Sequence, residues 1–155
     1  MNKDKTNLHE VYVHISDTGD IIAPPNSSAF LTDLTGWTKI DEGRGDRYHL
    51  AQAHYFDKPY QTRGGAFRYR LVDGKVEEKP NDEIAQEEAT LVAARKKQEQ
   101  IEGLKLQLSD SDYKIIKCME CSIAGVETPY DITTLHNERQ AIRDQINALE
   151  SSENK

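Results

Sequence analysis

The C-terminal stretch 109–150 restricts the fold most, because it has the pattern of two helices with marked ends. Ser109, with Asp112 three positions later, is a capping-box-like start for the first helix. Gly125 stands where a left-handed residue would end that helix. Asp131 is a candidate N-cap for the second helix. This punctuation predicts a pair of helices joined by a short loop.

The second helix of this pair carries a narrow, mainly apolar stripe. Its members are separated by alternating steps of three and four residues, which is the spacing of a short heptad repeat. The stripe consists of Ile132, Leu135, Arg139, Ile142, Ile146 and Leu149. A stripe this narrow does not stabilise an isolated, solvated helix. We therefore predict that these six residues drive self-association, so that the protein is a homo-oligomer, or that they bind another protein.

A long helix is predicted ahead of this pair. Asn81 or Asp82 is a candidate cap after Pro80, and no proline follows before residue 107. Gly103 is the only glycine in that stretch. The apolar positions approach a heptad seam that charged residues interrupt, so this helix needs other helices or a second copy of the chain for stability.

The N-terminal half has the patterns of a small antiparallel β-rich domain. Apolar and polar residues alternate over 9–15, and 37–40 is another candidate strand. The clearest hairpin joins 67–72 to 75–78, because Asp73-Gly74 supplies the positive φ angles of a tight turn.

The predicted fold class is therefore α+β. A β-rich docking domain is expected over residues 1–79, and a helical association region with coiled-coil character over 80–155. The helical region would comprise the long helix and a C-terminal helical hairpin. A length of 155 residues suits one ordinary domain or two small ones. With 36% hydrophobic residues and a mean hydropathy of −0.78, the core must be modest.

The order of residues in this helical pair resembles the C-terminal segment of small bacteriophage tail proteins. It is similar to the tail-fibre assembly chaperone group, whose pattern runs from an Asp–aromatic pair to a Pro and then an R-x-x-L-R-like helix. The matching positions here are Asp112-Tyr113, Glu120, Pro129 and Arg139 to Arg143. The chain departs from that pattern in having Tyr113 where Trp is common and in a longer helical insert at 82–108.

The N-terminal half extends the resemblance over most of residues 10–150. Segments 27–59 and 67–79 look like parts of short proteins encoded near the tail-fibre genes of phages from Firmicutes-type hosts. The resemblance implies a non-enzymatic structural or assembly component of the tail, whose partner is a tail fibre or baseplate protein. Such a protein acts in the host cytoplasm during assembly or stays in the virion tail. The alternative is a small phage inhibitor of a host defence system that binds a host protein or sequesters a small molecule.

Aromatic residues and arginines alternate within residues 37–70 of a chain that is otherwise poor in aromatics. Both residue types are favoured anchors of protein interfaces. We predict that a partner-binding surface is formed by Trp37, Tyr48, Tyr55, Phe56, Arg68, Tyr69 and Arg70. The competing interpretation is that the aromatics form the core of the β-rich domain.

The remaining motifs do not predict an active site or a cofactor. Cys118 and Cys121 form a C-x-x-C pair, but they lie within the apolar face of a predicted helix without a second ligand pair, so we expect buried thiols rather than a zinc or redox site. His49 and His54 lack the i, i+4 spacing of helical metal ligands. Arg44-Gly45-Asp46 is a chance match to an adhesion tripeptide in a glycine-rich turn. We expect no catalytic residue, no metal and no enzymatic activity.

Charge and hydropathy bear on the possible partners. The net charge of −7 disfavours nucleic-acid binding, which requires clustered Lys or Arg to neutralise phosphates. The sequence contains no apolar window of 18 residues and no apolar run near residue 1, so neither a membrane span nor a signal peptide is expected.

Overall fold

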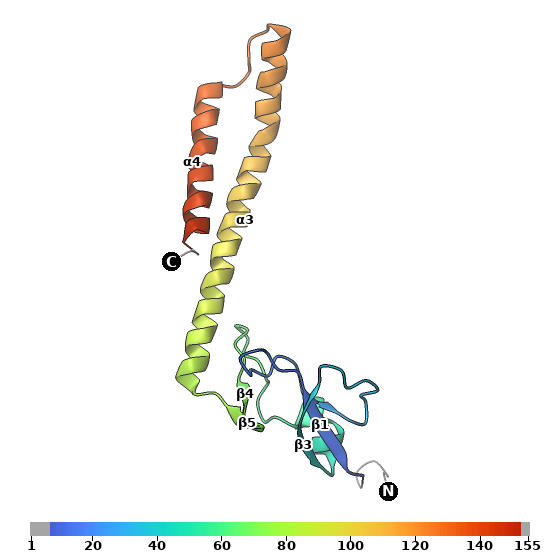
Figure 1. Ribbon diagram of the computed structural model, residues 1–155. Helices are drawn as coiled ribbons and strands as arrows, with labels where there is room; N and C mark the ends of the chain where they lie inside the picture. The colour runs from blue at the N-terminus through green and yellow to red at the C-terminus, as the bar shows by residue number, and fades with distance from the viewer. Residues whose placement is uncertain (1–6, 153–155) are drawn as a thin grey trace. The chain divides into compact units, whose positions relative to one another are not determined.

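The computed structural model describes residues 7–152 and confirms the α+β fold class (Figure 1). The chain forms two compact units that divide within α3, between Val92 and Ala93. The elements in chain order are β1 (His9–Val13), β2 (Asn26–Ser27), β3 (Thr38–Gly43), α1 (Asp46–His49), α2 (Ala51–His54), β4 (Tyr69–Val72), β5 (Lys75–Glu78), α3 (Asn81–Ala124) and α4 (Ile132–Ser151).

The sheet of the first unit is antiparallel, with β1 between β2 and β3. In β1 Val11 and Val13 are fully buried, but Tyr12 between them is buried as well, so the predicted alternation is present only in part. A register shift between Val11 and Tyr12 marks a bulge opposite β3. The short helices α1 and α2 cover residues 46–54, where the sequence had not indicated helix.

The predicted hairpin of β4 and β5 is confirmed. Leu71 pairs with Val76, and the turn between the strands contains Asp73 at φ 48° and Gly74 at φ 77°. Two successive positive φ angles are the signature of a type I′ turn, which matches the twist of the flanking strands.

The core of the first unit consists of two adjoining apolar clusters. One is formed by Val11, Ala51 and Tyr55, and the other by Val13, Ile21 and Tyr69. Ile40 and Phe56 pack against both clusters and so connect them.

The first three turns of α3 belong to this unit, because their carboxylates contact the segment 64–79. Glu83 accepts hydrogen bonds from Arg70 at 3.1 and 3.2 Å. Glu88 accepts one from the backbone N–H of Gly64 at 2.7 Å, and Glu87 binds the Lys79 ammonium. The boundary predicted from the sequence, at 79/80, therefore leaves out the first turns of α3. These contacts attach those turns to the sheet unit.

In the second unit α4 runs antiparallel beside the C-terminal part of α3 (Figure 1). The ends predicted from the sequence are present. Gly125, at φ 65°, and Val126 donate backbone hydrogen bonds to Ser122 and Cys121, which is the Schellman pattern. The carboxylate of Asp131 accepts from the Thr133 N–H at 3.0 Å and caps α4.

The predicted helix start at Ser109 is wrong, because α3 continues through it from Asn81 to Ala124. Serine and aspartate are weak helix formers rather than breakers. The Ser111 hydroxyl donates to the Leu108 carbonyl at 2.8 Å, within the helix. Without proline between Pro80 and Pro129, nothing in the sequence forces the helix to end before Gly125.

Candidate functional site

The aromatics predicted to bind a partner lie largely in the core of the sheet unit. Tyr55 and Tyr69 are buried members of the two clusters. Phe56 stacks on Tyr69 with ring centroids 4.0 Å apart, and Tyr48 meets the edge of Tyr55 at 6.3 Å. The structure thus brings these four predicted residues together, and much of their surface is used in folding.

Trp37 is separate from this group. Its ring lies over His14, with centroids 3.9 Å apart, and the His14 Nδ1 is 2.9 Å from the carbonyl oxygen of Gly36. Trp37 therefore stabilises the loop before β3 rather than joining the other aromatics.

The two predicted arginines are both half-buried at β4. Arg70 pairs with Glu83 of α3. The Nε atoms of Arg68 and Arg70 are buried, and neither makes a hydrogen bond within the described residues. Both side chains are thus partly withdrawn from the surface on which a partner would bind.

A surface hollow of about 450 Å³ nevertheless opens over part of the aromatic group. The Arg47 guanidinium lies over the ring of Tyr55, 5.0 Å from its centroid. Lys58 and Glu78 pair at 2.6 Å. The lining residues are Arg47, Tyr55, Phe56, Asp57, Lys58, Tyr69, Val76 and Glu78. We call this hollow the Arg47 hollow.

The Tyr55 phenol contributes a fixed polar group beside the Arg47 hollow. Its hydroxyl donates to the Asp41 carboxylate at 2.9 Å. Burial raises the pKa of Tyr55 well above its usual value, and the hydrogen bond to Asp41 raises the pKa further. The phenol therefore stays protonated and keeps the ring in place as a wall for Arg47.

The six stripe residues of α4 mostly face α3 within the same chain. Leu135 and Ile146 are buried, and Ile142 and Leu149 are half-buried, whereas Ile132 at the start of α4 is exposed. Packing against α3 therefore accounts for most of the stripe without a second chain.

Arg139, the polar member of the stripe, binds the middle of α3. Its guanidinium donates to the Leu108 carbonyl at 2.7 Å and to the Asp112 carboxylate at 2.8 Å, and it also contacts the Ser111 hydroxyl. A guanidinium carries five donors in a fixed fork, so it can satisfy all three acceptors. These bonds fix α4 in register on α3.

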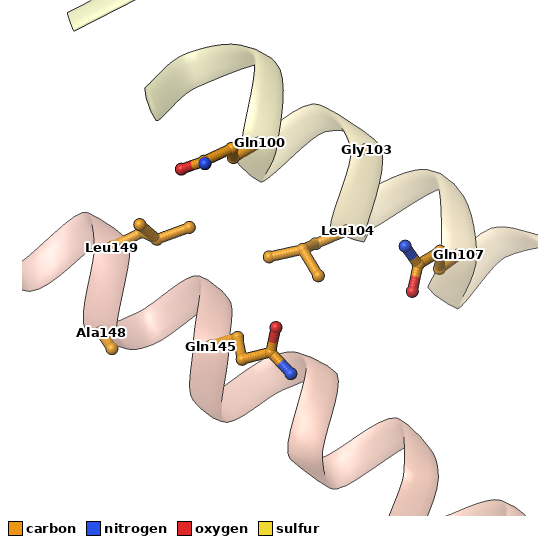
Figure 2. A pocket seen from close by; sticks show the side chains of 7 residues that line it. All are labelled: Gln100, Gly103, Leu104, Gln107, Gln145, Ala148 and Leu149. Atoms are coloured by element: carbon orange, nitrogen blue, oxygen red, sulfur yellow. The ribbon is translucent and has the colours of Figure 1, made fainter. Parts of the chain in front are cut away.

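Between Arg139 and the C-terminal end of α4, the two helices leave an open groove of about 600 Å³, which is shown in Figure 2. Leu104 and Leu149 point into it from opposite helices. Gly103 and Ala148 contribute little side-chain volume. The remaining lining residues are Gln100, Gln107 and Gln145, so the groove offers amides and no ionisable group.

An unpaired apolar surface of the second unit lies near the C-terminal end of α3. Tyr113, Ile116, Met119 and Ile123 are 66%, 63%, 59% and 86% exposed, and Val126 just beyond the helix is 56% exposed. We call these five residues the α3 outer face. The sequence analysis did not identify this surface.

A signal for this surface was present in the sequence. The packing face of α3 is made of Ile115, Cys118 and Cys121, at steps of three residues. Ile116 and Ile123, seven residues apart, lie on a different side of the helix. Two apolar stripes on one helix, with a single partner helix to cover them, leave one stripe exposed.

The predicted burial of Cys118 and Cys121 is confirmed, and both thiols are free. The Cys118 Sγ is 3.8 Å from the Tyr130 carbonyl oxygen, to which it donates. His49 is half-buried beside His9, whereas His54 is exposed. Among residues 7–152, no group of three or more His, Cys, Asp or Glu side chains is placed to hold a metal ion.

No helix within the described part of the chain is long and apolar enough to cross a membrane.

Comparison of the sequence and the structure with protein-family models, curated proteins and solved structures finds no match.

Proposed function

We propose that this protein is a non-enzymatic bacteriophage tail protein, a structural or assembly component of the fibre or baseplate that acts by binding other proteins. In this role it works in the host cytoplasm during assembly, as a fibre chaperone does, or enters the virion tail. The proposal rests on the sequence resemblance to the tail-fibre assembly group and on the places that its residues occupy in the fold.

The contact between Asp112 and Arg139 carries the proposal. These residues begin the two parts of the motif that resembles the assembly group, and their side chains meet at 2.8 Å. Arg139 also binds the Leu108 carbonyl of α3. The spacing between the two parts of the motif is therefore explained by a helical hairpin in which this ion pair joins them.

The Arg47 hollow supports protein binding by the sheet unit. Arginine and tyrosine are among the side chains most enriched in interface anchors, because they combine a large contact area with directional hydrogen bonding. Arg47, Tyr55 and Tyr69 line this hollow together. Partner recognition is thus proposed for its rim, where Arg47 remains exposed.

Two measurements test the proposal. Purified virions of a phage that encodes this chain, or assembly intermediates containing fibre or baseplate protein, should contain the chain when probed by mass spectrometry. Arg47→Glu should weaken its capture by that tail protein about thirty-fold, the loss expected for an interface anchor worth about 2 kcal/mol.

Arg44→Glu is the matched control, because Arg44 is exposed and lies three residues away outside the hollow. Its capture should stay within a factor of about three of the wild type. Recovery of the chain only with a host protein, and never with virion or fibre components, would contradict the tail assignment and favour the defence-inhibitor alternative.

A further inference from the structure

The α3 outer face is not accounted for by the packing of the hairpin. Its four helical members are spaced by three and four residues or by seven, so they share one side of α3. Each is at least 59% exposed. Solvated apolar residues scattered singly need no explanation, but a contiguous group of this kind marks a binding surface.

Four of the five residues of this face are placed symmetrically in the sequence about the point between Met119 and Glu120, and Met119 itself is mirrored by Glu120. Ile116 and Ile123 stand at equal distances from that point, and so do Tyr113 and Val126. A two-fold interface requires this property. If residue i of one copy contacts residue j of the other, then residue j of the first copy must contact residue i of the second. If two copies of α3 pair antiparallel about this point, Ile116 meets Ile123 of the other copy and Tyr113 meets Val126.

The charges beside the face fit the same arrangement. Lys117 and Glu120 form an ion pair at 2.9 Å within one chain. They stand close to the symmetry point on either side of it, so in the antiparallel pair Lys117 of one copy lies beside Glu120 of the other. Along the contact the order of charges is Lys117, Glu120 of the other copy, Glu120, and Lys117 of the other copy, so each carboxylate has an ammonium beside it.

The exposed area is sufficient for a modest interface. From their exposed fractions, the five side chains present on the order of 500 Å² of apolar surface, at the upper end of what an ordinary monomer leaves uncovered. Two copies would together bury about 1,000 Å², near the lower limit for a specific protein–protein contact. The expected dimer is thus reversible and depends on concentration.

We propose that the α3 outer face is a homodimer interface in which two hairpins pair antiparallel about Met119–Glu120 to form a four-helix arrangement. This deepens the proposed function by naming one partner of the helical region, a second copy of the chain. It also moves the self-association surface from the α4 stripe to an exposed face of α3.

Light scattering during size-exclusion chromatography of the full chain tests the interface. At about 100 μM the mass should approach twice the chain's 17.6 kDa and should fall towards the monomer on dilution. Ile116→Asp combined with Ile123→Asp should give a monomer whose helical circular dichroism is unchanged, because both side chains are solvated in the monomer. Leu106→Asp is the control, since Leu106 is 62% exposed but lies ten residues, about 15 Å, from Ile116.

Disulfide trapping tests the antiparallel geometry separately. Met119→Cys lies beside the symmetry point and should cross-link to itself between copies on oxidation. Tyr113→Cys should not, because in this pairing two copies of residue 113 are about 19 Å apart, beyond the reach of a disulfide. Equal self-cross-linking of both variants would mean parallel pairing and would overturn the proposed geometry.

A wild-type protein that stays monomeric at 100 μM, or a dimer that survives the double substitution, would overturn the interface itself. Either result would leave the tail assignment standing, since that is decided by the presence of the chain in virions or fibre intermediates.

Discussion

Lys79 shows at the level of a single residue how the sheet unit holds the start of α3. Its side chain is only 2% exposed, and its ammonium donates to Asp20 at 3.2 Å and to Glu87. A buried cation is tolerated only when its charge is paired and its donors are bonded. These contacts therefore join the residue after β5 and the start of α3 to a segment 59 residues earlier in the sequence.

The same environment determines how Lys79 responds to pH. Burial lowers the pKa of Lys79, but the hydrogen bonds to Glu87 and Asp20 outweigh burial, so the net pKa is raised. A raised pKa means that the folded state binds this proton more tightly than the unfolded state does. The contribution of protonated Lys79 to the stability of the folded state is complete below about pH 10, the ordinary range of lysine. It is lost as the pH rises through the raised pKa of Lys79.

We expect Lys79→Ala to lower the free energy of unfolding by about 3 kcal/mol, because it leaves two carboxylates facing each other without their cation. Urea denaturation followed by tyrosine and tryptophan fluorescence measures this change. Lys58→Ala is the control: the Lys58 side chain is 53% exposed in its pair with Glu78, so its loss should cost less than about 1 kcal/mol. Equal effects of the two variants would contradict the role given to Lys79.

At the level of elements, α3 shows that a helix can continue across residues that locally favour its ending. Gly103 lies in its interior with nothing near the position of a Cβ atom, and Ser109 starts no new helix. Burial of Ile101, Cys118 and Cys121 on the side facing α4 compensates these weak positions. Packing of the hairpin, rather than local preference, thus sustains the helix.

Two glycine-to-alanine substitutions should therefore change the free energy of unfolding in opposite directions. Gly103→Ala should raise the free energy of unfolding of the hairpin by about 1 kcal/mol, because alanine loses less conformational freedom in a helix and the site has room for the methyl group. Gly74→Ala should lower the stability of the sheet unit by about 1 kcal/mol, because its φ of 77° strains any residue with a Cβ atom. Thermal unfolding by circular dichroism gives both values, and a destabilising Gly103→Ala would show that the groove of Figure 2 is tighter than described.

At the level of the whole molecule, the boundary between the compact units lies inside a helix. Glu83, Glu87 and Glu88 belong to α3 but bind residues of the sheet unit. A fragment cut at residue 79 loses these carboxylates and leaves Lys79 and Arg70 without their partners from α3. The natural limit of the sheet unit is therefore near Val92.

We expect fragment 1–92 to fold and fragment 1–79 to be markedly less stable. Proton–nitrogen NMR spectra should be well dispersed for the longer fragment and partly collapsed for the shorter one at the same temperature. The triple variant Glu83→Gln, Glu87→Gln, Glu88→Gln in fragment 1–92 separates the effect of charge from that of chain length. Identical melting of 1–79 and 1–92 would contradict this account.

The sequence by itself determined the features that depend on neighbours within a few residues. The Asp73-Gly74 turn, the Gly125 helix end and the Asp131 cap are each closed by backbone or side-chain geometry over two to five positions. Their chemistry is local, so residue type and order suffice to predict them.

Only the tertiary structure decided which of the many apolar and charged groups are buried. Tyr55 and Tyr69 become core because β1 and the loop residue Ile21 pack on them, and the α4 stripe is covered because α3 extends beside it. The same packing leaves Ile116 and Ile123 exposed, although their spacing resembles that of a buried stripe. Burial depends on elements tens of residues away, and no local pattern states which of two apolar faces a distant partner will cover.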